Sequence, residues 1–275
     1  MNGSAVYAPG CMPEESLKSL LVTAIAAAET AGPVIRGYFG SQRLGLERKR
    51  DGSPVTLADR EAERVIRAQL ALAPGTPLDI LGEEEGLSGT GTRWRWTVDP
   101  IDGTRSFVRG IPLCGSMIGL EDTGDGRALL GVIHLPMLGV TYAGAAGLGA
   151  VRNGEPIHLP ESAALEDAII GTGDVAQFTE AGRLEEYRRL TALHGYVRGY
   201  PDCFGHGLVI EGALGAMFDP ALNPWDLVPT RALVEAAGGV AIVVPSKAPG
   251  KFDALFGNRA LVARLDSELG LSGQA

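Results

Sequence analysis

The segment Trp96-Thr97-Val98-Asp99-Pro100-Ile101-Asp102-Gly103-Thr104 decides the fold and the chemistry of this sequence. An apolar run leads into two carboxylates three positions apart, with a proline between them that restricts the backbone. Gly103 has no side chain and lets a ligand approach the backbone closely, and the amides of Gly103 and Thr104 can hold an anion at the start of a helix. Because Mg²⁺ prefers oxygen ligands, we expect a strand that ends in a site for a metal and a phosphate group.

Two further acidic segments have the same setting. Gly82-Glu83-Glu84-Glu85-Gly86 follows another apolar run, and Trp225-Asp226 precedes a helical pattern. An acidic triplet by itself is more often a solvated loop. Carboxylates that gather at strand ends repel one another without a metal, so the three segments together favour a metal site.

Periodicity predicts an α+β half over residues 1–158 and an α/β half over residues 159–275. In the first half we expect helices over 14–39 and 57–72, with Gly32-Pro33 kinking or ending the first one. The strands expected there cover 78–81, 94–98, 116–121, 129–135 and 140–143. In the second half, strands over 168–172, 195–199, 215–218 and 240–244 alternate with helices over 180–193, 204–212, 227–237 and 259–269.

Composition excludes several classes of protein. With 275 residues, 45% of them hydrophobic and 21% charged, the chain is not a disordered one. A net charge of −9 argues against nucleic acid as a partner. Three cysteines without CxxC spacing predict neither a disulfide framework nor a thiolate zinc site, which suits a reducing cytoplasm. The first residues lack the pattern of a secretory signal, and we expect no membrane partner.

On four ordered motifs, the chain resembles the inositol monophosphatase superfamily of Mg²⁺-dependent, Li⁺-sensitive phosphatases. The motifs are Asp51-Gly52-Ser53-Pro54-Val55-Thr56-Leu57-Ala58-Asp59, Gly82-Glu83-Glu84, the opening segment, and Trp225-Asp226 with Glu235-Ala236-Ala237-Gly238-Gly239 downstream. The sequence segments 102–113 and 200–206 are most similar to the histidinol-phosphate phosphatase branch. The resemblance implies a layered αβαβα sandwich of the inositol monophosphatase/fructose-1,6-bisphosphatase type, a small phosphorylated metabolite as substrate, and a homodimer.

The resemblance also implies two to three Mg²⁺ ions in each active site. Glu83, Asp99 and the Ile101 carbonyl would hold the first ion. The second would lie between Asp99, Asp102 and Asp226, and a third, weaker one near Glu83.

Catalytic roles follow from the same resemblance. Asp59 and Thr104, together with Glu83, would orient and deprotonate a metal-bound water that attacks phosphorus. Asp102-Gly103-Thr104 would contact the phosphate, and Lys49 would lie near the waters of the outer metal.

Substrate choice is expected to depend on Asp202, Asp219 and Asp226. Inositol-cleaving relatives carry a small or hydroxyl residue at the position of Asp202 and a longer Glu at that of Asp219. The added negative charge suits a cationic leaving group, so we expect hydrolysis of L-histidinol phosphate. The alternative substrates are an inositol phosphate or a sugar phosphate. The alternative to an enzyme is a non-catalytic module that binds metal and phosphate. Asp202 and Asp219 could instead only cap helices or face solvent.

Overall fold

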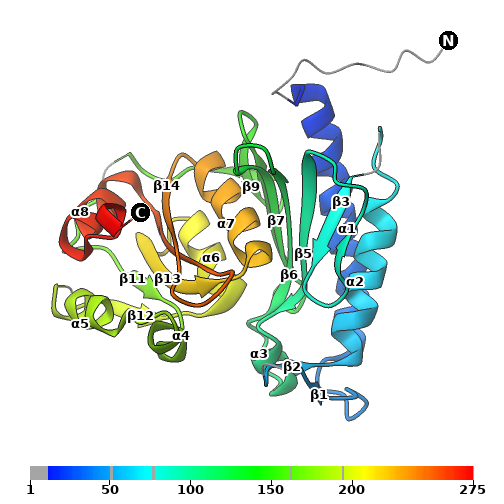
Figure 1. The fold of residues 1–275 in the computed structure, drawn as a ribbon, viewed down its shortest axis with the longest axis horizontal. Helices are drawn as coiled ribbons and strands as arrows, with labels where there is room; N and C mark the ends of the chain where they lie inside the picture. The colour runs from blue at the N-terminus through cyan, green and yellow to red at the C-terminus, as the bar shows by residue number, and fades with distance from the viewer. Residues whose placement is uncertain (1–11, 50–51, 76–77, 162, 194, 275) are drawn as a thin grey trace.

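The computed structural model describes residues 12–49, 52–75, 78–161, 163–193 and 195–274. Its elements form five layers in the order helix, sheet, helix, sheet, helix, which confirms the predicted sandwich (Figure 1). One outer layer holds α1 (Glu14–Tyr38) and α2 (Leu57–Leu70), and the middle layer holds α6 (Asp202–Ile210) and α7 (Pro224–Ala236). The other outer layer holds α4 (Val175–Glu180), α5 (Leu184–Leu193) and α8 (Arg259–Leu269).

The first sheet has eight strands in the order β10-β9-β8-β7-β6-β5-β3-β4. They are β3 (Asp79–Gly82), β4 (Gly86–Ser88), β5 (Trp94–Asp102), β6 (Gly115–Asp122), β7 (Arg127–Leu135), β8 (Val140–Ala145), β9 (Gly149–Arg152) and β10 (Glu155–Ile157). β3 and β5 run parallel, and the other neighbours are antiparallel. The carboxyl ends of β3 and β5 therefore meet at one edge of the sheet. Near this edge lie the short helix α3 (Thr104–Val108) and a hairpin of β1 (Glu47–Arg48) and β2 (Pro54–Val55).

The second sheet has five strands in the order β12-β11-β13-β15-β14. They are β11 (Ile170–Thr172), β12 (Val197–Gly199), β13 (Ala216–Leu222), β14 (Val240–Pro245) and β15 (Phe252–Gly257), and the 3₁₀ turn Ser272–Gln274 follows α8. The sequence patterns missed β15. A charged residue, Asp253, interrupts its apolar run, and this residue is buried because Arg183 Nε donates to its Oδ2 at 2.7 Å.

Two predicted helices have different ends. The helix expected over 180–193 begins only at Leu184, as α5, because Gly182 with φ 65° separates it from the preceding helix α4, which the sequence patterns missed. α1 does not end at Gly32-Pro33 but continues to Tyr38. Pro33 is exposed, so the carbonyl that loses its helical partner can be solvated.

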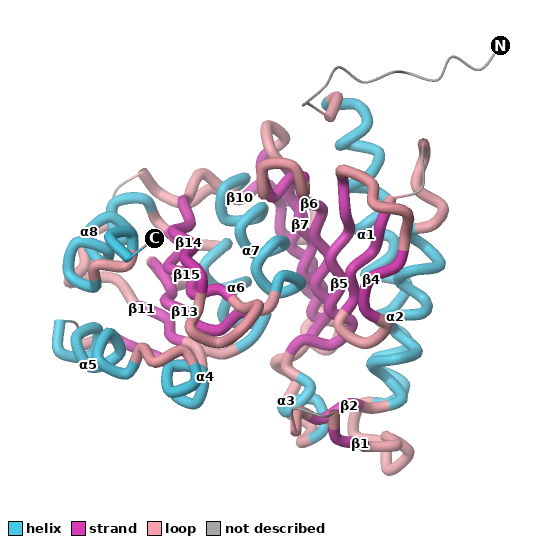
Figure 2. Tube along the Cα trace, viewed as in Figure 1, coloured by secondary structure: helices cyan, strands magenta, loops and turns pink. Residues whose placement is uncertain are grey.

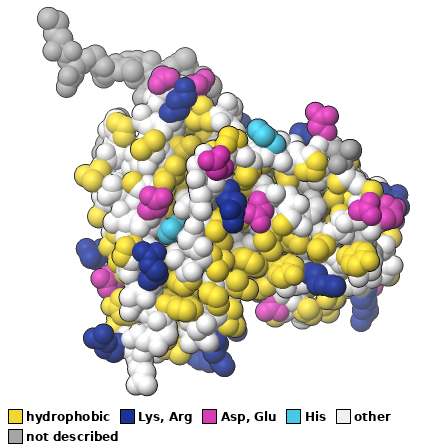
Figure 3. Space-filling model, turned by 180° about the vertical axis from the view of Figure 1, so that it is seen from behind, with side chains coloured by type: hydrophobic (Ala, Val, Ile, Leu, Met, Phe, Trp, Pro, Cys, Tyr) yellow, Lys and Arg dark blue, Asp and Glu magenta, His cyan; other side chains and the backbone are white. Residues whose placement is uncertain are grey.

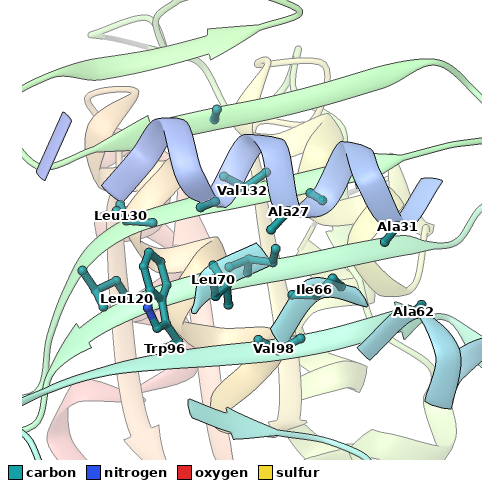
Figure 4. Close-up of a cluster of buried hydrophobic side chains, with 14 of the residues drawn as sticks. Ala27, Ala31, Ala62, Ile66, Leu70, Trp96, Val98, Leu120, Leu130 and Val132 are labelled. Atoms are coloured by element: carbon teal, nitrogen blue, oxygen red, sulfur yellow. The ribbon is translucent and has the colours of Figure 1, made fainter. Parts of the chain in front are cut away.

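The largest part of the core lies between α1, α2 and the first sheet. α1 presents small side chains at helical spacing, Ala24, Ala27, Ala28 and Ala31, all fully buried. Figure 4 shows Trp96 and Val98 of β5, with Leu120, Leu130 and Val132, meeting these two helices. By length and composition α1 could also cross a membrane, but its buried face packs in this core.

Each sheet is built from one half of the sequence, and α6 and α7 lie between the two sheets (Figure 2). α7 contacts strands of both sheets. The division at residue 158 stays a prediction. On the face shown in Figure 3, charged side chains of both signs are scattered among apolar ones.

The contact between α7 and the first sheet depends on a glycine. A Cβ at Gly131 of β7 would collide with the backbone of Pro229 in α7. We therefore expect Gly131→Ala to lower the free energy of unfolding by about 2–3 kcal/mol through overpacking. The control is Gly37→Ala in α1, where a Cβ meets nothing within 4 Å and where we expect a gain of up to about 1 kcal/mol. Urea unfolding measures both changes, and equal midpoints for the two variants would contradict the close packing.

Candidate active site

Elements from both halves of the chain end at one cleft of about 370 Å³. Its lining comprises Ser53, Pro54, Glu83, Gly103, Thr104, Arg105, Ser106, Asp174, Ala176, Gln177, Glu180, Pro201 and Asp202. The carboxyl ends of β3 and β5 supply its base, and the first residues of α3, α4 and α6 supply its walls.

The end of β5 is irregular, and its two carboxylates directly precede the cleft residues Gly103 and Thr104. The pairing of β5 with β6 shifts register between Asp99 and Asp102. Pro100 has no amide hydrogen for the ladder, and its carbonyl accepts from Ser116 Oγ at 2.8 Å instead. The two aspartates therefore lie in a bulged strand that continues to Asp102, beyond the end expected at residue 98.

Three carboxylates converge at this point. Asp99, Asp102 and Asp226 each offer an oxygen, and these oxygens lie within 4.8 Å of one another. Asp226 is not ahead of a helix but in the first turn of α7, where its Oδ2 accepts from the Asn223 amide at 3.0 Å. Within the described chain, Asp99 Oδ1 and Asp226 Oδ1 are buried and have no hydrogen-bond partner. Unpaired buried carboxylate oxygens are the ligands that a hard divalent cation would satisfy, so these residues fit a metal.

The electrostatics of the cluster agree with this fit. Burial, with the charge of Glu83, raises the pKa of Asp226 to about 7. The pKa values of Asp99 and Asp102 are raised well above their usual range, mainly by burial and then by neighbouring carboxylates. A bound cation would remove the repulsion that raises these pKa values.

Asp59 and Thr104 lie together beside the cluster. Thr104 Oγ1 lies 3.3 Å from Asp59 Oδ1 and 3.0 Å from the Ile101 carbonyl oxygen, so its one hydrogen is shared between two acceptors. Asp59 Oδ2 accepts from the amide of Thr56 at 2.7 Å and from its hydroxyl at 2.6 Å. Burial raises the pKa of Asp59 even though the Thr56 hydrogen bonds oppose this.

Lys49 reaches the site through the acidic segment after β3. Its Nζ lies 2.7 Å from both Glu83 Oε1 and Glu84 Oε1. Burial opposes its charge, but the two carboxylates prevail and raise the pKa of Lys49. Arg50 and Asp51, the next two residues of the sequence, lie outside the described residues.

A residue that sequence reasoning missed shapes the same segment. Glu63 of α2 is fully buried and accepts from the amides of Glu84 at 2.8 Å and Glu85 at 3.1 Å. Arg67 Nε donates to it at 2.8 Å. No local pattern distinguishes Glu63 from the polar face of a helix, so only the fold reveals its role.

The far wall separates the two acidic residues expected there. Asp202, with φ 60°, begins α6 and lines the cleft. Burial raises its pKa to about 6; the charges of Asp219 and Asp174 add to this rise, and that of His206 opposes it. Asp219 is only 2% exposed, and its Oδ2 lies 2.9 Å from His206 Nε2 behind that wall. The structure therefore brings Asp202 to the cleft surface but not Asp219, and neither faces open solvent.

Two further site residues had a sequence signal that was not used. Thr56 precedes Asp59 by three positions, and Asp174 precedes Gln177 by three, which is the spacing of a capping box. Both boxes are formed, and they orient Asp59 and the start of α4 at the cleft.

Comparison with known proteins agrees with this geometry. The sequence profile of the inositol monophosphatase family matches residues 16–266. A histidinol-phosphatase of Chlorobaculum parvum is 39% identical over 220 residues, which is 80% of this chain and 83% of that protein. An inositol-1-monophosphatase of Mesorhizobium japonicum is 33% identical over 227 residues, 80% of this chain and 84% of that one.

Solved structures give the same result. The extragenic suppressor protein suhB of Bartonella henselae superposes with a TM-score of 0.80 at 27% identity, covering 91% of this chain and 98% of that chain. The chain belongs to the inositol monophosphatase family and is a phosphatase, as its four motifs predicted.

Proposed function

We propose that this phosphatase uses Mg²⁺ to hydrolyse L-histidinol phosphate to L-histidinol and phosphate. The observation that carries the proposal is the convergence of Asp99, Asp102 and Asp226 beneath a cleft whose far wall bears Asp174 and Asp202. Relatives named histidinol-phosphatase at 33–39% identity support the substrate.

Asp99, Asp102 and Asp226, whose oxygens lie within 4.8 Å of one another, would hold one Mg²⁺. From the family resemblance, Glu83, Asp99 and the Ile101 carbonyl would hold another, with a third near Glu83. Bound Mg²⁺ lowers the pKa of a coordinated water and offsets charge on the phosphoryl oxygens.

The residues of the chain position the nucleophile and the phosphate. Thr104 directs its hydrogen toward Asp59 and Ile101, so its lone pair is free to accept from a water in the cleft. Asp59 can take up the proton, because a raised pKa makes it a stronger base, and Glu83 assists from the cleft base. Gly103, at φ 81°, starts α3, and its amide and that of Thr104 would contact phosphate oxygens.

The substrate wall is acidic. Asp202 and Asp174 lie on one side of the cleft, and the charge of Asp174 contributes to the raised pKa of Asp202. Histidinol carries an amine beside its phosphate, so these carboxylates would attract the substrate. Asp226 would lie near the leaving oxygen, and Asp219 would support the wall from behind.

A substrate panel tests the choice. Phosphate release from histidinol phosphate should exceed that from inositol 1-phosphate, which is the nearest alternative and is favoured by the relatives of that name. Asp202→Asn should raise the KM for histidinol phosphate about tenfold and the KM for inositol 1-phosphate by less than about threefold. Equal effects on the two substrates would refute the electrostatic argument. Absence of Mg²⁺-dependent turnover with any substrate would favour the binding module.

Assembly and location stay predictions. We propose a homodimer in the cytoplasm, with a small phosphorylated metabolite as its partner and neither nucleic acid nor a membrane.

A further inference from the structure

A buried hydrogen-bond chain that includes Asp219 lies behind the far wall. His206 of α6 lies 2.9 Å from Asp219 of β13 through Nε2 and 2.7 Å from Thr230 of α7 through Nδ1. Thr230 Oγ1 in turn lies 2.7 Å from the carbonyl oxygen of Asp226. His206, Asp219 and Thr230 are 1%, 2% and 0% exposed. The chain of contacts therefore links the second sheet to the first turn of α7.

A count of hydrogens determines the direction of each bond. The Asp226 carbonyl can only accept, so the single hydroxyl hydrogen of Thr230 is directed to it. Thr230 Oγ1 must then accept from His206, and Nδ1 carries a hydrogen. An ionised carboxylate also only accepts. One more hydrogen therefore lies between His206 Nε2 and Asp219 Oδ2.

This count makes the pair neutral. Whether the shared proton lies on the imidazole or on the carboxyl, the charges of His206 and Asp219 sum to zero. The surroundings favour neutrality, because Asp219 Oδ1 is buried without a hydrogen-bond partner within the described chain. Asp219 Oδ1 packs against Gly173, where a Cβ would collide with it. The Phe256 ring contacts the imidazole of His206 edge-on, with ring centroids 5.2 Å apart, and fixes its orientation.

We propose that His206 and Asp219 share one proton as a neutral pair, so that Asp219 adds no net charge to the substrate wall. Through Thr230 the same pair holds the first turn of α7, which makes His206 a positioning residue for Asp226. The part that concerns substrate charge rests on the proposed function, whereas the proton count and the link to Asp226 do not.

Nitrogen NMR of the imidazole tests the proton count without any substrate. The chain has four histidines, and contacts with the Phe256 ring identify that of His206. We expect His206 Nδ1 to carry a hydrogen in the folded, metal-free protein. An Nδ1 without hydrogen beside a protonated Nε2 would leave the pair with a negative charge and would overturn the proposal.

Matched variants of Thr230 test the positioning role. Thr230→Val removes the hydroxyl that joins His206 to Asp226, and we expect Mg²⁺ affinity, measured by titration calorimetry, to fall about tenfold. Thr230→Ser keeps the hydroxyl and should restore affinity to within about twofold. A purely structural role would lower thermal stability in Thr230→Val without this change in Mg²⁺ affinity, and that result would overturn the positioning role.

Asparagine variants test the charge of the wall. In Asp219→Asn the amide can donate to Nε2 and keep all three hydrogen bonds. We expect this variant to change the ratio of KM values for histidinol phosphate and inositol 1-phosphate by less than about twofold, against about three- to tenfold for Asp202→Asn. A shift in Asp219→Asn as large as that in Asp202→Asn would overturn the neutral pair. If Asp202→Asn does not shift the ratio, the proposed substrate is contradicted instead. The NMR result alone then tests whether His206 and Asp219 form a neutral pair.

Discussion

Asp226→Asn should abolish most of the activity while making the metal-free protein more stable. Removal of one charged ligand from the carboxylate cluster should lower kcat/KM at least about 10³-fold and weaken Mg²⁺ binding at least about tenfold. The variant should remain folded, because the amide oxygen of asparagine can still accept from the Asn223 amide that Asp226 caps.

The stability change depends on pH, and its sign follows from linkage. The pKa of Asp226 is raised to about 7 by burial and by Glu83, whereas an unfolded aspartate titrates near pH ~3.9. The folded state thus binds this proton more tightly than the unfolded state does. The free energy of unfolding of the wild-type protein therefore falls as pH rises from about 4 to about 7. At about 1.4 kcal/mol per pKa unit, the loss is on the order of 4 kcal/mol, and asparagine avoids it.

Thermal unfolding in EDTA at pH 5 and pH 8 measures this effect. We expect Asp226→Asn to unfold at a higher temperature than wild type at pH 8, and by a much smaller margin at pH 5, where the loss amounts to only about one pKa unit. With excess Mg²⁺ the order at pH 8 should reverse, because wild type gains more from binding. Asp174→Asn is the control, since Asp174 lies at the same cleft outside the cluster and asparagine also caps α4. An Asp226→Asn variant with wild-type Mg²⁺ affinity would disprove the ligand assignment.

The cluster could be anticipated because its parts are local in sequence. Asp99 and Asp102 end an apolar run, Glu83 follows another and Asp226 begins a helix, so each is recognisable from its own segment. Which of them share a metal was predicted from the family resemblance, and the oxygens of Asp99, Asp102 and Asp226 lie within 4.8 Å of one another. The alternation of elements favoured α/β layers, whereas the five-layered αβαβα sandwich was predicted from the family resemblance.

Contacts between distant residues were not accessible in this way. Asp253 is buried because of Arg183, 70 positions earlier, and without that partner the run containing β15 does not look like a strand. Asp219 was expected to contact substrate from its place six residues before Trp225, but its orientation depends on His206, 13 positions earlier. Which carboxylate lines a cleft and which lies behind it is decided by tertiary partners.

Thr104→Val should lower kcat about 10²- to 10³-fold while leaving substrate KM and Mg²⁺ affinity nearly unchanged. Valine keeps the shape of threonine but removes the hydroxyl that lies 3.3 Å from Asp59 Oδ1. Without it, a water in the cleft loses both the acceptor that orients it and the route for its proton to Asp59, and general base catalysis of this kind contributes about 10²–10⁴ in rate. Steady-state kinetics with histidinol phosphate, together with Mg²⁺ titration, measures the effect.

Thr104→Ser separates this role from packing. Serine restores the hydroxyl with less bulk, so we expect at least about a tenth of wild-type kcat, far above the valine variant. The two variants also differ in the bond to the Ile101 carbonyl, whose loss in valine should cost only about 1 kcal/mol of stability. If serine and valine lost kcat equally, the methyl group and not the hydroxyl would matter, and Asp59 would have no path to the nucleophile through Thr104. A parallel loss of Mg²⁺ affinity in valine alone would instead place the hydroxyl among the metal ligands, because an acceptor that only orients water leaves the binding constant unchanged.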